Sequence, residues 1–497
     1  MSDVVQKFWG FCHTLRHDGI DYGDYIEQIT YLLFLKMADE RRIDLSHVGG
    51  TGGTGETGAA GVATDCSWPC LSALAGLALL DHYTAVLQAL GREEGLLGEI
   101  FDEAVSRFKK AENLKRLIGL IDETEWTALE VDVKAAVFEG LLEKAASEGK
   151  KGAGQYFTPR LLIQAIVRCV RPDPRQLPEL TVCDPACGTG GFLVVAYEWF
   201  LAASRGSALS PELQERVRRD TYFGQELVER PRRLAFMNLY LHGLAPEIRR
   251  GDSIDEPAGE RRFDVVLTNP PFGNKGANQA PGRPDFPVTT SNKQLNFLQH
   301  VLTLLKPGGR AAVIVPDNCL FADQAGEVFE VLTAQCDLHT VLRLPNGTFT
   351  PYSAGTKTNV VFFTKGRPTE TVWVYDARTN VPRITKKDRP LNAAHFAAFE
   401  ACYGADPDGR SPRSPEDAAD DRWRSFPMSE VEARDYKIDN LKWLKDLSPE
   451  GDDLPTPEEL AADIATDLEE ALEEIAAIQD LLDEDKVRRP RVLARRR

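Results

Sequence analysis

The sequence predicts an α/β fold, in which a parallel sheet built from strand–helix units is preceded by a helical region and followed by one long helix. Three observations predict it. Short β-branched or apolar runs alternate with helix-length stretches in residues 151–395. In residues 1–150, apolar residues recur at helical intervals with little strand signal. In residues 456–497, apolar residues recur three and four positions apart.

Length and composition agree with a multidomain globular protein. The chain has 497 residues, enough for two or three folding units. Its 42% hydrophobic and 27% charged residues exclude collagen-like, mucin-like and fully disordered chains. We expect a helical N-terminal domain (1–150, with a Gly/Thr-rich loop at 49–61), a catalytic core (151–395), an irregular linker (396–455) and an acidic amphipathic helix with a basic tail (456–497).

The negative charge is concentrated near the C-terminus. Of the net charge of -17, a large part comes from Asp446 to Asp485, which hold 16 acidic residues and no Lys or Arg. Residues 1–445 hold 60 acidic and 52 basic residues, and the last twelve residues hold seven basic ones. Because Lys and Arg supply the non-specific attraction to nucleic acid, we expect another component to hold any DNA on which this chain acts.

The cysteines and apolar segments predict a cytoplasmic protein. Nine cysteines in 497 residues are too few, and odd in number, for a disulfide scaffold. The pairs Cys66/Cys70 and Cys183/Cys187 lack a second ligand pair nearby, so we predict no metal site. The N-terminus has no signal region, and its longest apolar patch, Tyr31–Leu35, is far too short to cross a membrane.

A Gly/Thr run at 49–61 contains Gly50-x-Gly52-x-x-Gly55, a formal match to the dinucleotide-binding fingerprint. That fingerprint requires a strand before it and a helix after it, and the flanking sequence supplies neither. We therefore predict a surface loop at 49–61.

The strands of the core are predicted from short apolar runs between turn signals. They are Leu180–Asp184, Thr221–Glu226, Ile248–Asp252, Phe263–Asn269, Arg310–Pro316, His339–Pro345 and Asn359–Lys365, with Thr371–Tyr375 as a possible addition. Gly191–Ala203 and Asn296–Leu305 have the length and periodicity of connecting helices.

The segment from Thr181 to Phe192 consists of a strand ending in an acid, a glycine-rich turn and a helix start. It is not GxGxxG, because Leu193 stands where the third glycine would fall, and no Lys-Ser/Thr pair follows as in a P-loop. An acid before a G-x-G-G turn suits a cationic nucleotide without phosphate, such as S-adenosylmethionine. The candidate cofactor-binding residues here are Asp184, Ala186, Gly188, Thr189, Gly190 and Gly191.

Two further acids follow the same pattern. Glu226 ends the second expected strand, where a carboxylate can accept from both ribose hydroxyls. Asp252 ends the third and could accept from the adenine amino group. One strand-end acid can equally cap a helix, but three along one sheet edge favour ligand binding.

The candidate catalytic residues are Asn269, Pro270, Pro271 and Phe272, which directly follow an apolar strand. Two consecutive prolines form a stiff turn with outward carbonyls. The Asn269 side-chain oxygen and the Pro270 carbonyl can accept from an exocyclic amino group, and Phe272 offers a stacking face for a planar base. A base must leave the duplex to reach such a site.

The motifs DPACGTGGF and NPPF resemble those of amino-group DNA methyltransferases. GQYFTPR at 154–160 resembles the third cofactor-contacting motif of these enzymes. TYLLFLKMADE at 30–40, GQELVERPRRLAFMNLYLHG at 224–243 and the acidic C-terminal helix are similar to the modification subunit of type I restriction-modification systems. The resemblance covers nearly the whole chain.

The resemblance implies a Rossmann-like class I S-adenosylmethionine-dependent methyltransferase core that methylates adenine N6. It places S-adenosylmethionine against Thr189 to Gly191, with Glu226 on the ribose, and puts adenine at Asn269–Phe272. It also assigns cofactor contacts to Gln155, Tyr156, Phe157, Thr158, Pro159 and Arg160. The partners implied are double-stranded DNA with a flipped adenine, a specificity subunit carrying two copies of this chain docked by the C-terminal helix, and a restriction/translocase subunit.

Other acceptors and roles remain compatible with the motifs. Asn-Pro-Pro-aromatic also occurs in enzymes that methylate cytosine N4, RNA bases or a protein glutamine amide. A stand-alone methyltransferase of another phage-defence system and a non-catalytic subunit that keeps the cofactor pocket are further alternatives. Within the methyltransferases, direct in-line transfer is expected, because Cys187 lies in the cofactor loop rather than beside Asn269 as a covalent nucleophile would.

Overall fold

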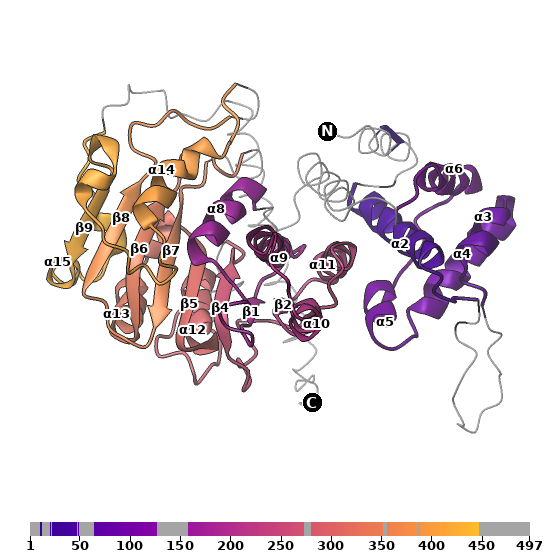
Figure 1. The fold of residues 1–497 in the computed structure, drawn as a ribbon, viewed down its shortest axis with the longest axis horizontal. Coiled ribbons are helices and arrows are strands. Elements are labelled where there is room, and N and C mark those ends of the chain that lie inside the picture. Colours follow the sequence, from indigo (N-terminus) through magenta and orange to yellow (C-terminus); the bar gives the residue numbers. More distant parts are fainter. Residues whose placement is uncertain are drawn as a thin grey trace, which may run out of the picture. The chain divides into compact units, whose positions relative to one another are not determined.

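The computed structural model describes residues 10–11, 20, 22–46, 48, 64–126, 158–272, 280–350, 355–385 and 388–446 (Figure 1). The chain forms two compact units. The first comprises residues 1–150, 174–179 and 187–250, and the second comprises residues 151–173, 180–186 and 251–497. The first unit thus joins the N-terminal region to a later stretch of the chain.

Helices make up most of the N-terminal part of the first unit, as predicted. They are α2 (Tyr22–Glu40), α3 (Trp68–Ala73), α4 (Gly76–Leu90), α5 (Leu96–Phe101) and α6 (Ala111–Asp122). Val48 and Thr64 form an antiparallel bridge, with N···O distances of 3.2 and 3.0 Å in its two hydrogen bonds. The predicted loop at 49–61 lies outside the described residues, between these two positions.

The rest of the first unit contains α9 (Gly191–Ala203), α10 (Pro211–Arg219) and α11 (Glu229–Leu241). Helix α11 packs against α2 and α5 of the N-terminal region. Buried Arg233 of α11 forms an ion pair with buried Glu27 of α2 and donates to the Asp102 carbonyl. Arg232 pairs in the same way with Glu99 of α5.

The strands follow the order β3-β2-β1-β4-β5-β7-β6-β8-β9 in one sheet. Their bounds are β1 (Val182–Asp184), β2 (Tyr222–Glu226), β3 (Glu247–Arg250), β4 (Phe263–Thr268), β5 (Leu305–Pro316), β6 (Cys336–Arg343), β7 (Thr358–Lys365), β8 (Thr371–Asp376) and β9 (Trp423–Pro427). The pairs β1/β4, β4/β5 and β2/β3 are parallel. Strand β7 lies between β5 and β6 and is antiparallel to both. The Rossmann-like prediction is confirmed, with a mixed rather than purely parallel sheet.

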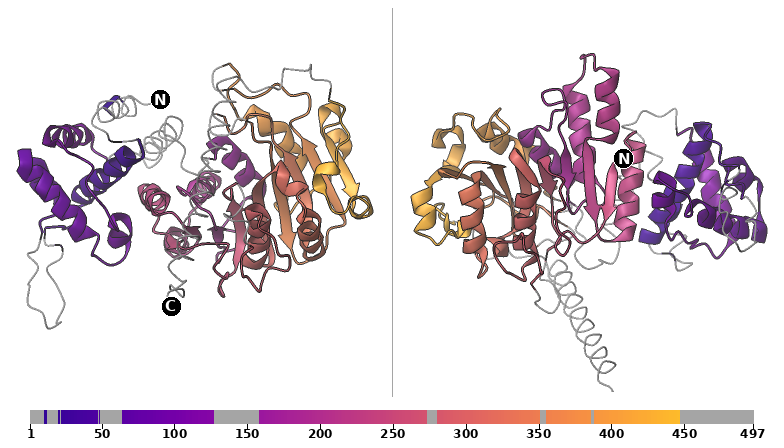
Figure 2. Two further views of the ribbon diagram at one scale, coloured as in Figure 1. Left: turned by 180° about the vertical axis from the view of Figure 1, so that it is seen from behind. Right: turned by 90° about the horizontal axis from the view of Figure 1, so that it is seen from below.

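Helices cover both faces of the sheet in the second unit. These helices are α8 (Arg160–Val170), α12 (Lys293–Leu304), α13 (Ala325–Gln335) and α14 (Ala394–Tyr403), and the short α15 (Met428–Glu432) follows β9. Helices α8 and α14 pack together on one face, where Phe362 of β7 meets Phe399 of α14 at 5.8 Å between ring centroids. The view from behind shows α12 and α13 on the other face (Figure 2).

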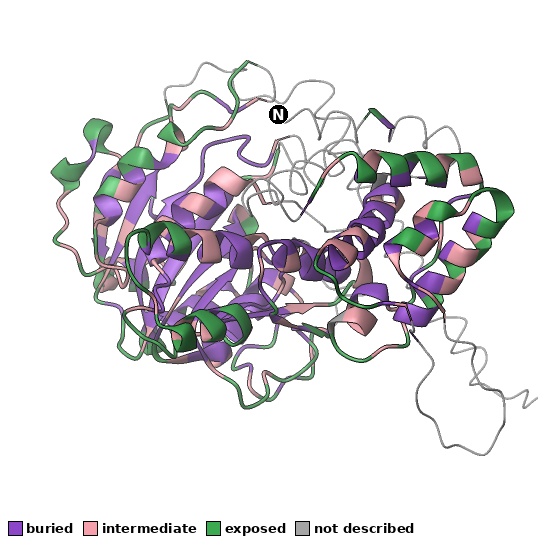
Figure 3. Cartoon of the chain, turned by 45° about the vertical axis from the view of Figure 1, so that its right-hand side comes forward, coloured by how far each residue is buried: buried purple, intermediate pink, exposed green. Residues whose placement is uncertain are grey.

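Burial of both faces explains why several central strands contain uninterrupted apolar runs. Every residue of β6 is buried, and so are all of β7 except Lys365 (Figure 3). A sheet covered on both faces selects β-branched and aromatic residues at successive positions rather than at alternate ones. Runs such as Val360–Phe363 are therefore a direct reflection of the two helical layers.

Two sequence predictions need correction. The irregular linker predicted at 396–455 is incompatible with β9, which pairs antiparallel with β8, and with α14. The strand signal at Trp423–Pro427 is short and interrupted by charge, because only Trp423 and Phe426 are buried and Arg424 between them is exposed. Strand β3 ends at Arg250, two residues earlier than predicted, so Asp252 lies in the following turn. The predicted C-terminal helix at 456–497 lies outside the described residues.

Within the described ranges, every helix is too short or too polar to traverse a bilayer.

Candidate active site

The turn after β1 begins at buried Asp184, whose Oδ1 accepts from the Ala186 backbone N–H at 3.1 Å. Gly188 and Gly190 then adopt φ values of 52° and 79°. Side chains disfavour this left-handed region, so glycine is required at both positions. A Cβ on Gly190 would also meet Ala235 and Leu239 of α11 at 3.4 Å. Gly188 and Gly190 thus allow a tight turn, after which the chain directly enters α9.

The same turn is held against β2 within the first unit. The Cys187 N–H donates to the Gln225 carbonyl at 3.0 Å, and a Cβ on Gly224 would lie 2.9 Å from the Cys187 sulfur. Glu226, the last residue of β2, accepts from the Gly188 N–H through Oε2 and from the Val228 N–H through Oε1, both at 2.9 Å. Burial raises the pKa of Glu226, and its three backbone hydrogen bonds oppose that shift.

Asp252 stands in the turn after β3 and caps it. Its Oδ1 accepts from the backbone N–H groups of Ile254 at 2.8 Å and Asp255 at 3.2 Å. The adjacent Ser253 donates its hydroxyl to the Pro185 carbonyl at 2.5 Å. The turn after β3 therefore contacts the start of the glycine-rich turn.

The predicted catalytic residues follow β4, which lies between β1 and β5 in the sheet. Asn269 is half-buried, and its Nδ2 donates to the Thr158 hydroxyl oxygen at 2.9 Å. Its Oδ1 is buried and has no hydrogen-bond partner among the described residues. The amide is thus held by its donor end, and its acceptor end remains available.

Phe272 completes the acceptor motif and is 8% exposed. Its ring contacts Phe349 edge to face, at 6.2 Å between centroids and an interplanar angle of 74°. Between the two ends of the motif, the Pro271 carbonyl accepts from Nε2 of buried Gln294 on α12 at 2.8 Å. Phe349 and Gln294 belong to no recognisable sequence motif, and only the fold brings them to the site.

The segment resembling the third cofactor-contacting motif is described from Thr158 onwards. Pro159 is the N-cap residue of α8, and Arg160 is its first residue. Gln155, Tyr156 and Phe157 lie outside the described residues. The structure therefore brings Thr158 to Asn269 and leaves the first half of this predicted motif undescribed.

Arg283 is a buried residue of the site region that the sequence does not reveal. It donates to the backbone carbonyls of Ser253 and Ile254 at 3.0 and 3.3 Å. It also forms two hydrogen bonds to Asp285 and one to Nδ1 of His300 at 3.2 Å. Burial, assisted by Arg283, lowers the pKa of His300 to about 3, so this imidazole is neutral at physiological pH.

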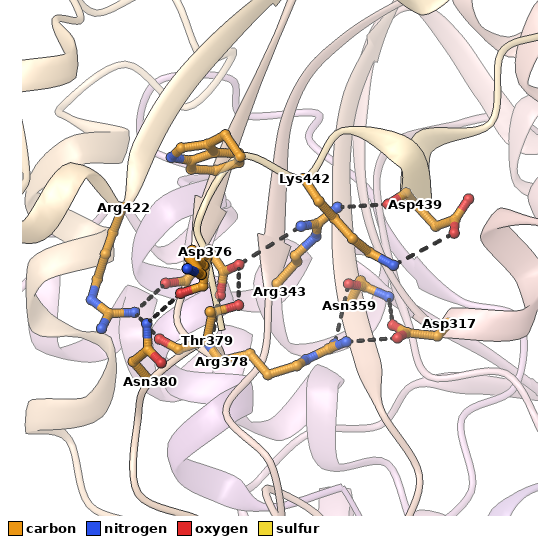
Figure 4. Close-up of polar contacts among 12 residues, drawn as sticks. Asp317, Arg343, Asn359, Asp376, Arg378, Thr379, Asn380, Arg422, Asp439 and Lys442 are labelled. Atoms are coloured by element: carbon orange, nitrogen blue, oxygen red, sulfur yellow. Dashed lines mark hydrogen bonds and ion pairs between the residues drawn. The ribbon is translucent and has the colours of Figure 1, made fainter. Parts of the chain in front are cut away.

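A second polar cluster lies where β5, β6 and β8 end and β7 begins (Figure 4). Arg378 forms an ion pair with Asp317 at 2.6 Å, and Asn359 donates to the same carboxylate at 2.8 Å. Nη1 of Arg343 and Oδ2 of Asp376 are 3.7 Å apart. Because Arg378 and Arg343 each face a carboxylate of a neighbouring segment, these contacts fix the ends of β5, β6 and β8.

Metal-ligating side chains do not gather in the part of the chain that the structure describes. Among these residues, no group of three or more His, Cys, Asp or Glu side chains has an arrangement that could hold a metal ion.

Sequence comparisons match nearly the whole chain to one family. A model of the N-6 DNA Methylase family matches residues 130–448, and one of the HsdM N-terminal domain matches residues 4–123. The chain is 35% identical to the methylase subunit of the type I restriction enzyme StySPI of Salmonella potsdam, with 96% of this chain and 94% of that protein covered. The EcoKI methylase subunit of Escherichia coli K12 gives the same identity and coverage.

Solved structures agree with this relationship. The crystal structure of the EcoKI M protein is 31% identical, covers 97% of this chain and 96% of its own, and superposes with a TM-score of 0.54. A chain of a type I restriction-modification system solved for its complex assembly and conformational transition is 27% identical and has a TM-score of 0.72, with 97% and 99% covered. The glycine-rich turn, the Asn-Pro-Pro-Phe motif and these matches together establish that the chain belongs to the N-6 DNA methylase family, as a methylase subunit of the type I restriction-modification class.

Proposed function

We propose that this chain binds S-adenosylmethionine at the turns after β1, β2 and β3 and methylates N6 of a flipped adenine held by Asn269, Pro270, Pro271 and Phe272. The observation that carries the proposal is the Asn269 amide, whose Nδ2 is engaged by Thr158 while its buried Oδ1 has no partner among the described residues. A buried acceptor without a donor is costly. The adenine amino group would supply the missing donor.

The residues present fit the cofactor. S-adenosylmethionine supplies an electrophilic methyl group on a positively charged sulfur. Glu226 already accepts from two backbone N–H groups and retains lone pairs for the ribose hydroxyls. Gly188 has open space where a side chain would stand, so a ligand can approach its backbone closely. Asp184 and Asp252 would add negative charge towards the cationic ligand, and Ala186, Thr189 and Gly191 would line the turn. Gln155, Tyr156, Phe157, Pro159 and Arg160 would complete the contacts, whereas Thr158, which the resemblance assigns to the same set, contacts Asn269.

The acceptor residues would act by orientation and electrostatics. The Asn269 Oδ1 and the Pro270 carbonyl would each accept from the adenine amino group, which directs the nitrogen lone pair away from the ring and towards the methyl donor. Phe272 would stack on the base. No covalent enzyme intermediate is required, so most of the rate enhancement would come from positioning and fixed dipoles.

We propose the partners from the net charge of this chain and from its similarity to subunits of known enzymes. The EcoKI and StySPI relatives are subunits of type I restriction enzymes. An acidic chain with a net charge of -17 needs a partner to hold DNA, and a separate specificity subunit carrying two copies of this chain would meet that need. A restriction/translocase subunit would join the same complex. Genomic DNA as the substrate would place the reaction in the cytoplasm.

The test is transfer of labelled methyl from S-adenosylmethionine to genomic DNA, followed by nucleoside analysis. The purified chain is assayed alone and together with the specificity protein encoded beside it. Label in N6-methyladenine that depends on the partner is the expected result. Label in N4-methylcytosine, or only in RNA or protein, would refute the adenine assignment, and label with the chain alone would refute the need for a specificity subunit.

A further inference from the structure

We propose that Thr158 and Gln294, which lie outside the Asn-Pro-Pro-Phe motif, are positioning residues that orient it for methyl transfer from two sides. This inference deepens the proposed function and rests on it. Thr158 lies two residues before α8, and Gln294 is the second residue of α12. Two elements far apart in sequence thus meet the same four-residue turn within the second unit.

Thr158 holds one end of the Asn269 amide. Its hydroxyl oxygen accepts from Nδ2 at 2.9 Å, over a separation of 111 residues. The amide has a carbonyl end and an amino end of nearly the same shape. If the amide rotated by 180°, its amino group would face the adenine amino group, and two donors would oppose each other. In the structure the Thr158 contact occupies Nδ2 and leaves Oδ1 to be presented. Because a hydroxyl can also donate, this contact fixes the position of the amide, and the adenine amino group would select the end that faces it.

Gln294 acts on the other end of the turn. Its side chain is fully buried, and its Nε2 donates to the Pro271 carbonyl at 2.8 Å. Neither proline of the motif has a backbone N–H to anchor the turn. The amide of Gln294 supplies that anchor from outside. It fixes the peptide between Pro271 and Phe272, and hence the direction in which the Phe272 ring leaves the backbone.

Helix α12 itself is built to hold Gln294 in place. Asn292 is its N-cap residue, and its side chain accepts from the Leu295 N–H at 3.0 Å. Gln299 on the same helix bonds to the backbone of Val288, at 2.8 and 2.9 Å, rather than to the motif. Two buried amides of one helix therefore have different partners, which provides a matched comparison.

The first test uses Thr158→Val and Thr158→Ser in the complex with the specificity subunit. Val keeps the shape and removes the acceptor, whereas Ser restores it. We expect Val to lower the single-turnover methylation rate about five- to tenfold, the change that one neutral hydrogen bond produces. The dissociation constant for S-adenosylmethionine and the Tm should be unchanged, and Ser should recover most of the rate. Thr333→Val, which removes a hydroxyl bonded only within α13, is the control.

A double-mutant cycle with Asn269→Ala separates positioning from other roles. If Thr158 acts through Asn269, Thr158→Val should cause no further loss in that background. Weaker cofactor binding at an unchanged rate would instead make Thr158 a cofactor contact and overturn the proposal. Loss of all adenine methylation by the wild-type complex would refute the proposed function itself, which distinguishes the two failures.

The second test compares Gln294→Met with Gln299→Met. Both remove a buried amide of α12, so we expect a similar lowering of Tm. Only Gln294→Met should lower the methylation rate measured well below the Tm, with cofactor affinity retained. Equal losses of rate in the two variants would show that helix stability alone matters and would overturn the role of Gln294.

Discussion

The backbone N–H of Gly188 donates to the Glu226 carboxylate at 2.9 Å, so the glycine-rich turn and the tip of β2 are joined by a direct hydrogen bond. Gly188 reaches this position with a φ of 52°, which a larger residue would rarely adopt. The predicted cofactor acid is therefore also part of the scaffold that shapes the predicted cofactor turn.

Replacing Glu226 by Gln should weaken cofactor binding without weakening the fold. Hydrogen bonds to a charged group contribute about 1.5–3 kcal/mol, so we expect the dissociation constant to rise about 10- to 100-fold. Burial raises the pKa of Glu226 in the folded protein, so its contribution to stability decreases as pH rises through that pKa. At neutral pH, Gln removes the buried charge but also one of the two oxygens that accept from Gly188 and Val228, so the Tm should change little. Calorimetric titration and thermal melts test this, with Glu247→Gln on β3 as control; unchanged affinity would contradict it.

Asn269→Ala should abolish methyl transfer and leave the cofactor site intact. Removing one preorganised group at a developing charge typically costs about 100- to 1,000-fold in rate. The dissociation constant for S-adenosylmethionine should stay within about twofold. Single-turnover methylation and equilibrium binding measure the two quantities. A variant that retained normal activity would exclude Asn269 from the chemistry.

Phe272→Ala should act on the DNA side of the reaction. Base stacking contributes about 1–3 kcal/mol per base, so kcat/KM for DNA should fall about 10- to 100-fold. Phe272→Tyr should retain most activity, because the ring and its edge contact with Phe349 survive. Steady-state kinetics on a duplex with one target site would show the difference. Equal losses in both variants would indicate that the ring packs only in the core.

Arg233→Met should destabilise the first unit strongly, because it leaves Glu27 buried without its cation. Breaking a buried ion pair from one side costs about 3–5 kcal/mol of unfolding free energy. The double variant with Glu27→Gln should recover much of that loss. The exposed pair of Arg249 and Glu247 provides a control, for which Arg249→Met should change stability by less than about 1 kcal/mol. Denaturant unfolding supplies the values.

His300 should make the fold sensitive to mild acid. Burial lowers its pKa from 6.5 to about 3, so the unfolded chain binds a proton that the folded chain does not. Its contribution to stability is therefore complete above pH 6.5 and is lost as pH falls towards 3, by at most about 1.4 kcal/mol per pH unit. His300→Gln, which can still accept from Arg283, should flatten the stability profile in this window. Parallel profiles for the two proteins would contradict the assignment.

The sequence is informative wherever a local pattern determines the structure. Gly188 and Gly190 mark the tight turn because only glycine tolerates their backbone angles. Strands such as β4 and β7 are visible as apolar runs because both faces of the sheet are covered. Asn269 is recognisable because it follows such a run directly and precedes two prolines.

The partners of these residues are not visible in the sequence, because they come from elements distant along the chain. Gln294 and Thr158 lie 23 and 111 residues from the motif atoms that they contact. In the sequence, Arg283 has the features of an ordinary loop residue, and its burial follows only from the fold. Strand β9 escapes prediction because it has only five residues, and the exposed Arg424 interrupts the apolar signal of Trp423 and Phe426.

The ion pair between Glu27 and Arg233 also constrains the order of events during synthesis. The two residues are 206 positions apart, so the ribosome completes Glu27 about 10–40 s before Arg233 at ordinary elongation rates. During that interval, the face of α2 that later contacts α11 exposes Glu27 next to an aromatic surface. Glu27 then still lacks the cation that Arg233 supplies. We therefore expect the nascent N-terminal helices to be a target for chaperones until α11 emerges, and a chain truncated before α11 to aggregate.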